Sequence, residues 1–343
     1  MFRTLLVAVA LFVTSAALVA TPARAQQLSR TEENRLKVFI DELLAFSRPY
    51  QAAMDETNQI LVLSMGGMEK ALDMSENGST DDAWVDAWAR DVTNRSAAVR
   101  GRLAGLPPFP VGQVEKMIAS APALRPRMVA MMGIEGAYKA TIVSSLDYAI
   151  SVIPDVRRLA RGDSDAAMPL YTSIIAGTRL IIRSENAMLE LQIAAAGPAS
   201  PQGSVSRGAM LTNDVLELLM AYQEGFLAGD SPDVSKLAKA LRGKALAIRQ
   251  IGVDIRRGVR DLEGQLSIIG DPVMRGQFNA ILKTYESNVA IEEEIAGKVD
   301  ALAAALERGD DPLDAMTPLL DYVDVAVDKR NAILEQRSGL LAR

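Results

Sequence analysis

An apolar stripe with helical spacing, running from Val234 to Ile269, constrains the fold more than any other feature. Its positions are separated by alternating steps of four and three residues, and none is charged or polar: Val234, Ala238, Leu241, Ala245, Ile248, Gly252, Ile255, Val259, Leu262, Leu266 and Ile269. A helix with such a seam buries one face against neighbouring helices, as in a coiled coil or bundle. Ala238, Ala245 and Gly252 are small and recur every seven residues, so a partner helix can approach closely. The stripe therefore predicts a helical bundle.

The rest of the chain repeats this helical pattern between glycine turns. No segment shows the apolar–polar alternation typical of strands, so the expected fold class is all-α. Turns are expected where a glycine precedes a residue that can cap the next helix: Gly78, Gly162, Gly229 and Gly309. Residues 197–208 contain two prolines, three serines and three glycines, a composition typical of a linker. We expect a first helical bundle over 26–196, this linker, and a second bundle over 209–343.

The two halves resemble each other. A shift of 147 positions places Tyr138 on Tyr285 and Leu159 on Leu306, and a slightly different shift places the segment 186–190 on 331–335. Small changes of shift at turns are what loop insertions produce. We therefore expect an internal duplication, with each half an antiparallel four-helix-bundle-like unit. The two units are either separate or fused into one elongated helical rod.

The N-terminus has the features of a secretory signal peptide. A basic start at Arg3 is followed by an apolar run over 5–20 and by Ala23-Arg24-Ala25, with small residues at the −3 and −1 positions. Cleavage is expected after Ala25, and a retained membrane anchor is the alternative. The apolar run is shorter than the roughly 20 residues that a comfortable span needs. No later segment is apolar enough to span a membrane, so the mature chain is expected in the periplasm.

Charge and composition narrow the functional classes. Cleavage would remove Arg3 and Arg24 and no acid, which leaves 35 basic against 43 acidic residues, a net charge of −8. Such an acidic chain is a poor candidate for nucleic-acid binding. The chain has no cysteine and no histidine. It therefore lacks the commonest metal ligand, the usual general base and the triad histidine, and we expect neither enzymatic activity nor a cofactor.

Four residues are candidates for ligand binding because they occupy equivalent places in the two halves under the 147 shift. They are two tyrosines and two arginines: Tyr138, Tyr285, Arg183 and Arg330. Symmetric positions can line a cleft shared by two repeats. Equivalent core residues would repeat in the same way, so core anchoring is the alternative.

The methionines offer a candidate metal site. Thioether sulfur suits Cu(I), and five methionines lie at helical spacing in two groups: Met65, Met68, Met128, Met131 and Met132. Methionine is also an ordinary filler of irregular helical cores. Because no histidine or cysteine supplements these groups, core packing is the default interpretation.

Glycines inside predicted helices mark a further irregularity. Gly66, Gly67, Gly133 and Gly136 each cost up to about 1 kcal/mol relative to alanine in a helix. Such glycines allow close helix approach, local bending or a gap that faces a ligand, and close packing is the favoured explanation.

Two functional hypotheses follow from these patterns. The first is a non-enzymatic exported protein that binds or scaffolds another envelope protein, or associates with itself, through a bundle surface or an inter-bundle groove. The alternative is a sensor or carrier of a small molecule or of Cu(I), with a pocket in a bundle core. Packed bundles with an exposed apolar patch favour the first, and a cavity with buried Arg, Glu or Tyr favours the second.

Overall fold

The computed structural model describes residues 30–120 and 125–341, which are largely helical and contain no strand. The α-helices, in chain order, are α2 (Arg30–Glu76), α3 (Asp82–Leu103), α4 (Val111–Ser120), α5 (Arg125–Ser151), α6 (Ile153–Ala160), α7 (Ala167–Ala196), α8 (Pro201–Leu227), α9 (Val234–Glu263), α10 (Pro272–Lys283), α11 (Tyr285–Arg308) and α12 (Pro312–Leu341). The all-α expectation is confirmed. The signal peptide and its cleavage site lie outside the described residues.

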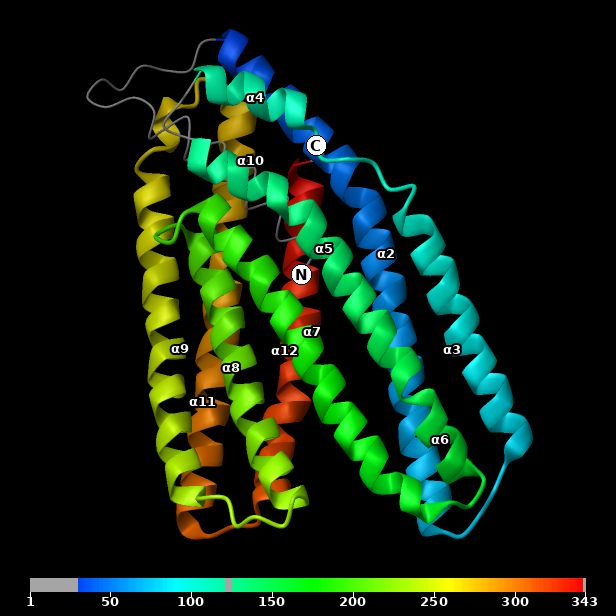
Figure 1. The fold of residues 1–343 in the computed structure, drawn as a ribbon. Coiled ribbons are helices and arrows are strands. Elements are labelled where there is room, and N and C mark those ends of the chain that lie inside the picture. Colours follow the sequence, from blue (N-terminus) through cyan, green and yellow to red (C-terminus); the bar gives the residue numbers. More distant parts are fainter. Residues whose placement is uncertain (1–29, 121–124, 342–343) are drawn as a thin grey trace.

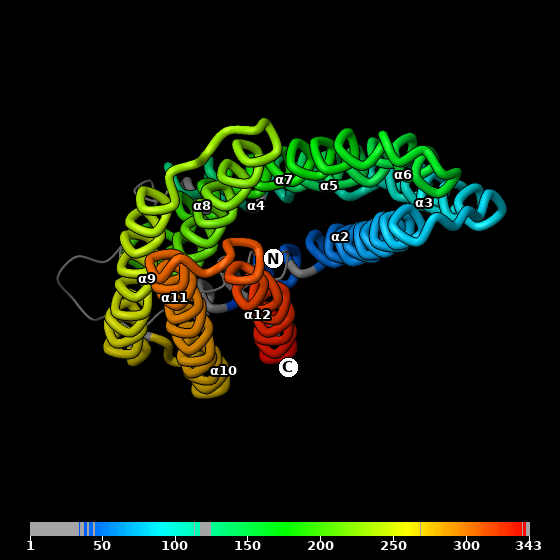
Figure 2. The backbone as a smooth tube through the Cα atoms, turned by 90° about the horizontal axis from the view of Figure 1, so that it is seen from below, coloured from blue at the N-terminus to red at the C-terminus, as the bar shows by residue number. Residues whose placement is uncertain are grey.

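The helices form two arms that meet along α7 and α8 (Figure 1). Helices α2, α3, α5, α6 and α7 make one arm, and α8, α9, α11 and α12 make the other. Seen from below, the two arms form an open arch with α7 and α8 in its middle (Figure 2). Within the described part of the chain, no helix is long and apolar enough to cross a bilayer.

The predicted turns are confirmed by the backbone. Gly78, Gly162, Gly229 and Gly309 all have a positive φ, the left-handed region that a residue without a Cβ adopts at little cost. Helix α9 then begins with an aspartate cap, since the Asp233 carboxylate accepts from the N–H of Lys236. The turns end helices for a local chemical reason, which is why their positions are visible in the sequence.

The seam of α9 packs against α11. Its positions from Ala238 to Leu262 are buried, and a Cβ added at Gly252 would lie 3.3 Å from Val289 of α11. The small residues of the seam therefore allow the close approach that the spacing predicts. Helix α9 ends before Gly264, so Leu266 and Ile269 continue the stripe outside the helix but remain buried.

Charged residues flank the α9 seam on its exposed side. Arg242 donates to Glu307 of α11 at 2.6 and 2.8 Å, and Arg256 lies 3.1 Å from Glu293 of the same helix. Solvent screens such surface pairs, so each adds little to stability. The pairs favour the antiparallel register of α9 and α11.

The non-helical connection between α7 and α8 is shorter than the composition of residues 197–208 predicts. Only Gly197–Ser200 is non-helical, because Pro201 occupies the first turn of α8 and Ser200 caps it through the N–H of Gly203 at 2.9 Å. The expected linker is therefore mostly the buried first turns of α8. The physical reason is close packing: a Cβ at Gly258 of α9 would lie 2.9 Å from Pro201.

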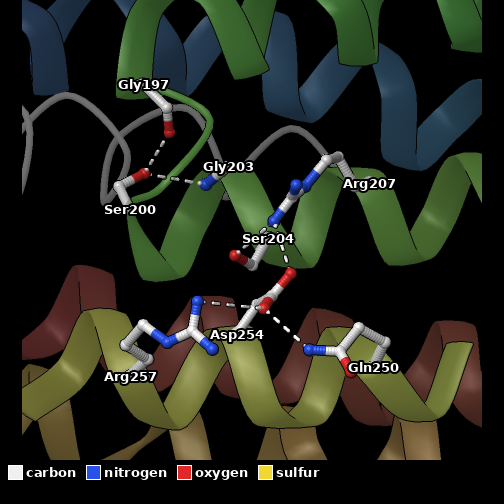
Figure 3. A network of polar contacts seen from close by, with 8 residues as sticks. All are labelled: Gly197, Ser200, Gly203, Ser204, Arg207, Gln250, Asp254 and Arg257. Carbon is white, nitrogen blue, oxygen red and sulfur yellow. Dashed lines mark hydrogen bonds and ion pairs between the residues drawn. The ribbon is translucent and has the colours of Figure 1, made fainter. Parts of the chain in front are cut away.

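A polar network fastens this part of α8 to α9 (Figure 3). Arg207 donates to Asp254 of α9 at 3.1 Å and to Ser204 at 3.0 Å. Gln250 donates to the other carboxylate oxygen of Asp254 at 3.1 Å. The start of α8 is therefore tied to the second arm rather than free between the arms.

The two arms share one hydrophobic core. A central cluster joins Met128 and Tyr138 of α5 with Ile255 of α9 and Tyr285 of α11. Two further clusters fill the outer parts of the arms, one around Trp88 and one within α8, α9, α11 and α12. The halves are therefore fused rather than separate. Whether they arose by duplication stays a prediction.

A buried polar centre as candidate ligand site

Two of the predicted ligand residues, the tyrosines, lie fully buried where the arms meet. The Tyr138 hydroxyl accepts from Nε2 of Gln192 at 3.5 Å, and the Tyr285 hydroxyl donates to Oε1 of Gln202 at 3.2 Å. Desolvation raises the pKa of both phenols, that of Tyr285 to about 12. Both side chains are thus neutral and act as packed hydrogen-bonding groups.

Arg337 of α12, which the sequence did not single out, is the largest fully buried side chain in the described structure. Its guanidinium carbon lies 3.8 Å from the centre of the Tyr285 ring. Its N–H groups donate to three neutral oxygens, those of Thr284 Oγ1, Asn288 Oδ1 and Gln202 Oε1. Among the described residues Arg337 makes no ion pair, and burial lowers its pKa. A positive charge is therefore buried against neutral groups.

Arg330, a predicted ligand residue, belongs to the same centre. It lies two helical turns before Arg337 on α12, so both face the same side. Arg330 Nη2 lies 2.6 Å from Oε1 of the fully buried Glu292 of α11. Desolvation raises the pKa of Glu292, and the Arg330 charge opposes that rise. The other carboxylate oxygen of Glu292 and Nε of Arg330 have no hydrogen-bond partner among the described residues.

A small cavity of about 40 Å³ lies between these arginines. Four helices line it: α7, α8, α11 and α12. The lining is mixed, with an apolar part from Leu189, Val205, Ala209, Val327 and Leu334 and a polar part from Gln192, Ser206, Asn288, Arg330, Asn331 and Arg337. The lining combines apolar side chains with convergent polar groups, as ligand sites do, but the volume is well below the several hundred Å³ of a typical ligand pocket.

The fourth predicted ligand residue, Arg183, lies elsewhere. It is exposed on α7 and lines a groove of about 420 Å³ between the diverging ends of α7 and α8. Arg179 in the same groove is already paired with Glu224 of α8 at 2.7 Å. Of the four predicted ligand residues only Arg330 lines the cavity. Tyr138 and Tyr285 lie behind its lining residues Gln192 and Arg337, and Arg183 lies apart.

The five candidate methionines occupy different surroundings. Met68 lies in the core of the first arm, and Met128 and Met131 lie in the shared central core. Met65 and Met132 are exposed. In the part of the chain that the structure describes, no cluster of three or more acidic side chains is placed to hold a metal ion. Thioether binding of Cu(I) stays a prediction, and each buried methionine already has apolar neighbours.

The spacing of two arginines of the centre is visible in the sequence, but spacing alone does not distinguish buried arginines from solvent-exposed ones. Arg330 and Arg337 are seven residues apart, the heptad distance that puts two side chains on one helix face. That face is otherwise apolar, with Ile333 and Leu334 both buried. Arginines within a buried stripe could have marked the site.

No known protein family, curated protein or solved structure matches this chain.

Proposed function

We propose that this protein is a non-enzymatic binding protein, a sensor or carrier, that holds a small ligand in the polar centre between its arms. The observation that carries the proposal is the buried charge of Arg337, whose partners in the described structure are neutral. Burying an arginine without a counter-charge costs several kcal/mol. An anionic ligand in the adjoining cavity would offset that cost. The compartment we propose is the periplasm, on the strength of the signal-peptide pattern at residues 1–25.

The test is native mass spectrometry of the protein purified from its own periplasm without refolding. We expect a small discrete mass above that of the mature chain, lost on denaturation and absent from an Arg337→Gln variant. The matched control is Arg183→Gln, which removes an exposed arginine from the groove outside the centre. A bare chain in the wild type, with no small molecule restored by a periplasmic extract, would contradict the proposal. The same spectra report whether residues 1–25 are removed.

A second candidate function is a scaffold for another envelope protein, and the groove between α7 and α8 favours it. Its walls include Met168, Ile175 and Leu227, of which Met168 is largely exposed. Arg183 at this groove makes no ion pair among the described residues. We expect an amphipathic helix with an acidic residue opposite Arg183 as the occupant.

Cross-linking in the periplasm tests this second candidate. Ala176→Arg places a bulky charge in the groove and should abolish a specific cross-linked partner, whereas Ala87→Arg on the exposed face of α3 should not. A cross-linked product of two identical chains would indicate self-association instead. Identical products from both variants would exclude the groove as the docking site.

A further inference from the structure

We infer that the ligand of the polar centre is a small monovalent carboxylate, with its carboxylate beside Arg337 and Arg330 and a short apolar tail against Leu189 and Leu334. This inference rests on the proposed function and specifies the chemistry of that same site. It draws on three properties of the centre: its charge, the geometry of its donors and its size.

The charge of the centre favours one negative charge. Arg337 and Arg330 contribute two positive charges, and Glu292 contributes one negative charge through its pair with Arg330. Glu185 of α7 also interacts with Arg330, but it lies outside the cavity and accepts a hydrogen bond from Asn213 at 3.5 Å. One positive charge therefore remains uncompensated at Arg337. A monovalent anion neutralises this charge, whereas a divalent anion would leave one negative charge buried away from water.

The donors of the centre match a carboxylate. A guanidinium offers its N–H groups in a planar fork, and a carboxylate accepts two of them side by side. Arg337 uses one hydrogen bond from each of its three nitrogens on neutral side chains, which leaves N–H groups on Nη1 and Nη2 for a ligand. Gln192 and Asn331 bring amide groups to the same cavity.

The size of the cavity limits the ligand to a few heavy atoms. A single water needs roughly 10–15 Å³ of such volume, so about 40 Å³ holds roughly three waters or a carboxylate with a short tail. Part of the cavity lining is apolar, formed by Leu189, Val205 and Leu334. An inorganic anion would gain nothing from that part, whereas the methyl or ethyl group of a short carboxylate would be desolvated against it.

The experiment is calorimetric titration of the mature full-length protein at constant ionic strength. The probes are acetate and propionate. Three compounds serve as comparisons. Acetamide has the shape of acetate without its charge, chloride has the charge without the apolar tail, and succinate has two charges. We expect saturable one-site binding of acetate and propionate. Acetamide should bind roughly 10- to 100-fold more weakly, since hydrogen bonds to a charged group contribute about 1.5–3 kcal/mol. Chloride and succinate should also bind more weakly than acetate.

Two variants locate the binding. Arg337→Gln should weaken acetate roughly 10- to 100-fold. Ala209→Leu keeps every charge but fills the cavity, and it should also abolish binding. Its matched control is Ala221→Leu, at an exposed position of the same helix, which should bind like the wild type. Folding of each variant is checked by circular dichroism, and Ala209→Leu remains informative if Arg337→Gln fails to fold.

The outcomes separate this inference from the proposed function. Binding of acetate that Ala209→Leu abolishes supports both. Chloride that binds as tightly as acetate overturns the carboxylate assignment in favour of an inorganic anion. A native ligand that depends on Arg337, together with no binding of acetate or propionate, keeps the proposed function and overturns this inference. No native ligand and no binding of any probe would overturn both.

Discussion

Replacing two adjacent glycines of α2 tests how closely α2 and α3 pack. A Cβ added at Gly67 would lie 2.2 Å from Cε2 and Nε1 of Trp88, whereas a Cβ at Gly66 would have nothing within 4 Å. The Trp88 ring cannot step aside freely, because it is largely buried and its Nε1–H donates to the Leu63 carbonyl at 2.9 Å. Gly67→Ala must therefore displace the ring, and Gly66→Ala should be accommodated.

The magnitude follows from three contributions. Alanine gains about 1 kcal/mol over glycine in a helix, and this gain is the same for Gly66 and Gly67. At Gly67 alone, overpacking costs about 1–3 kcal/mol and loss of the Trp88 hydrogen bond costs about 0.5–1.5 kcal/mol. Gly67→Ala should therefore be less stable than Gly66→Ala by about 1.5–4.5 kcal/mol. Relative to the wild type, Gly66→Ala should be slightly more stable.

The assay is urea unfolding followed by circular dichroism, with the midpoint and the slope reported for each variant. Tryptophan emission gives a local readout, because the chain has only two tryptophans, and the rings of Trp84 and Trp88 stack at 6.2 Å. The emission spectrum should change in Gly67→Ala and not in Gly66→Ala. Equal midpoints and equal spectra for the two variants would refute the close approach of α2 to Trp88.

The polar centre supports two further predictions. Gly208→Ala places a Cβ 2.7 Å from Oε2 of Glu292, so it should disturb the ion pair between Glu292 and Arg330. We expect the free energy of unfolding to fall by about 2–5 kcal/mol in the same urea assay. The control Gly243→Ala, which has open space around it, should raise that free energy by up to about 1 kcal/mol. Burial raises the pKa of Glu292, so between the unfolded pKa of about 4.3 and the folded pKa the folded chain retains a proton that the unfolded chain has released. The stability from this group is lost over that window, above which Glu292 is the carboxylate that pairs with Arg330. The urea midpoint of the wild type should fall over that window relative to Glu292→Gln, and parallel profiles would show that the carboxyl group is not perturbed.

The features that the sequence predicts well are those whose causes are local. The α9 seam is visible because a helix buries every third or fourth residue, and the turns at Gly162 and Gly309 are visible because a positive φ favours glycine. The composition of residues 197–208 predicts a linker, whereas most of this segment is helical and belongs to α8. Its glycines and serines do not loosen the chain but let α8 pack closely, and only the approach of Gly258 to Pro201 shows this.

The polar centre could be predicted only in part, because it is made by tertiary contacts. The internal similarity pointed to Tyr138, Tyr285 and Arg330, and the structure places all three around the junction of the arms. The same similarity also pointed to Arg183, which lies in the exposed groove. From the sequence alone, an arginine in a helix is expected to be exposed to solvent. Only the packing of α12 against α11 and α8 shows that Arg337 is buried.

A comparison within the molecule bears on whether the fold itself needs the buried charge. The shift that places residues 186–190 on 331–335 also places Gln192 on Arg337. Each contacts the tyrosine of its own half: Gln192 donates to Tyr138 at 3.5 Å, and the Arg337 guanidinium lies 3.8 Å from the Tyr285 ring centre. A neutral glutamine therefore suffices at this position in one half.

If the same holds in the other half, the cost of burying Arg337 serves a purpose other than packing. Arg337→Gln should then fold without ligand, because a glutamine already fills the matching position against Tyr138. Replacing buried ionic groups by neutral side chains of similar volume is often close to neutral for stability when no partner charge is left unpaired, and Arg337 has no carboxylate partner among the described residues. We therefore expect the free energy of unfolding, measured by urea denaturation, to lie within about 2 kcal/mol of the ligand-free wild type. Unfolding of Arg337→Gln under those conditions would show that the fold requires the cation, and the charge would then no longer indicate a ligand.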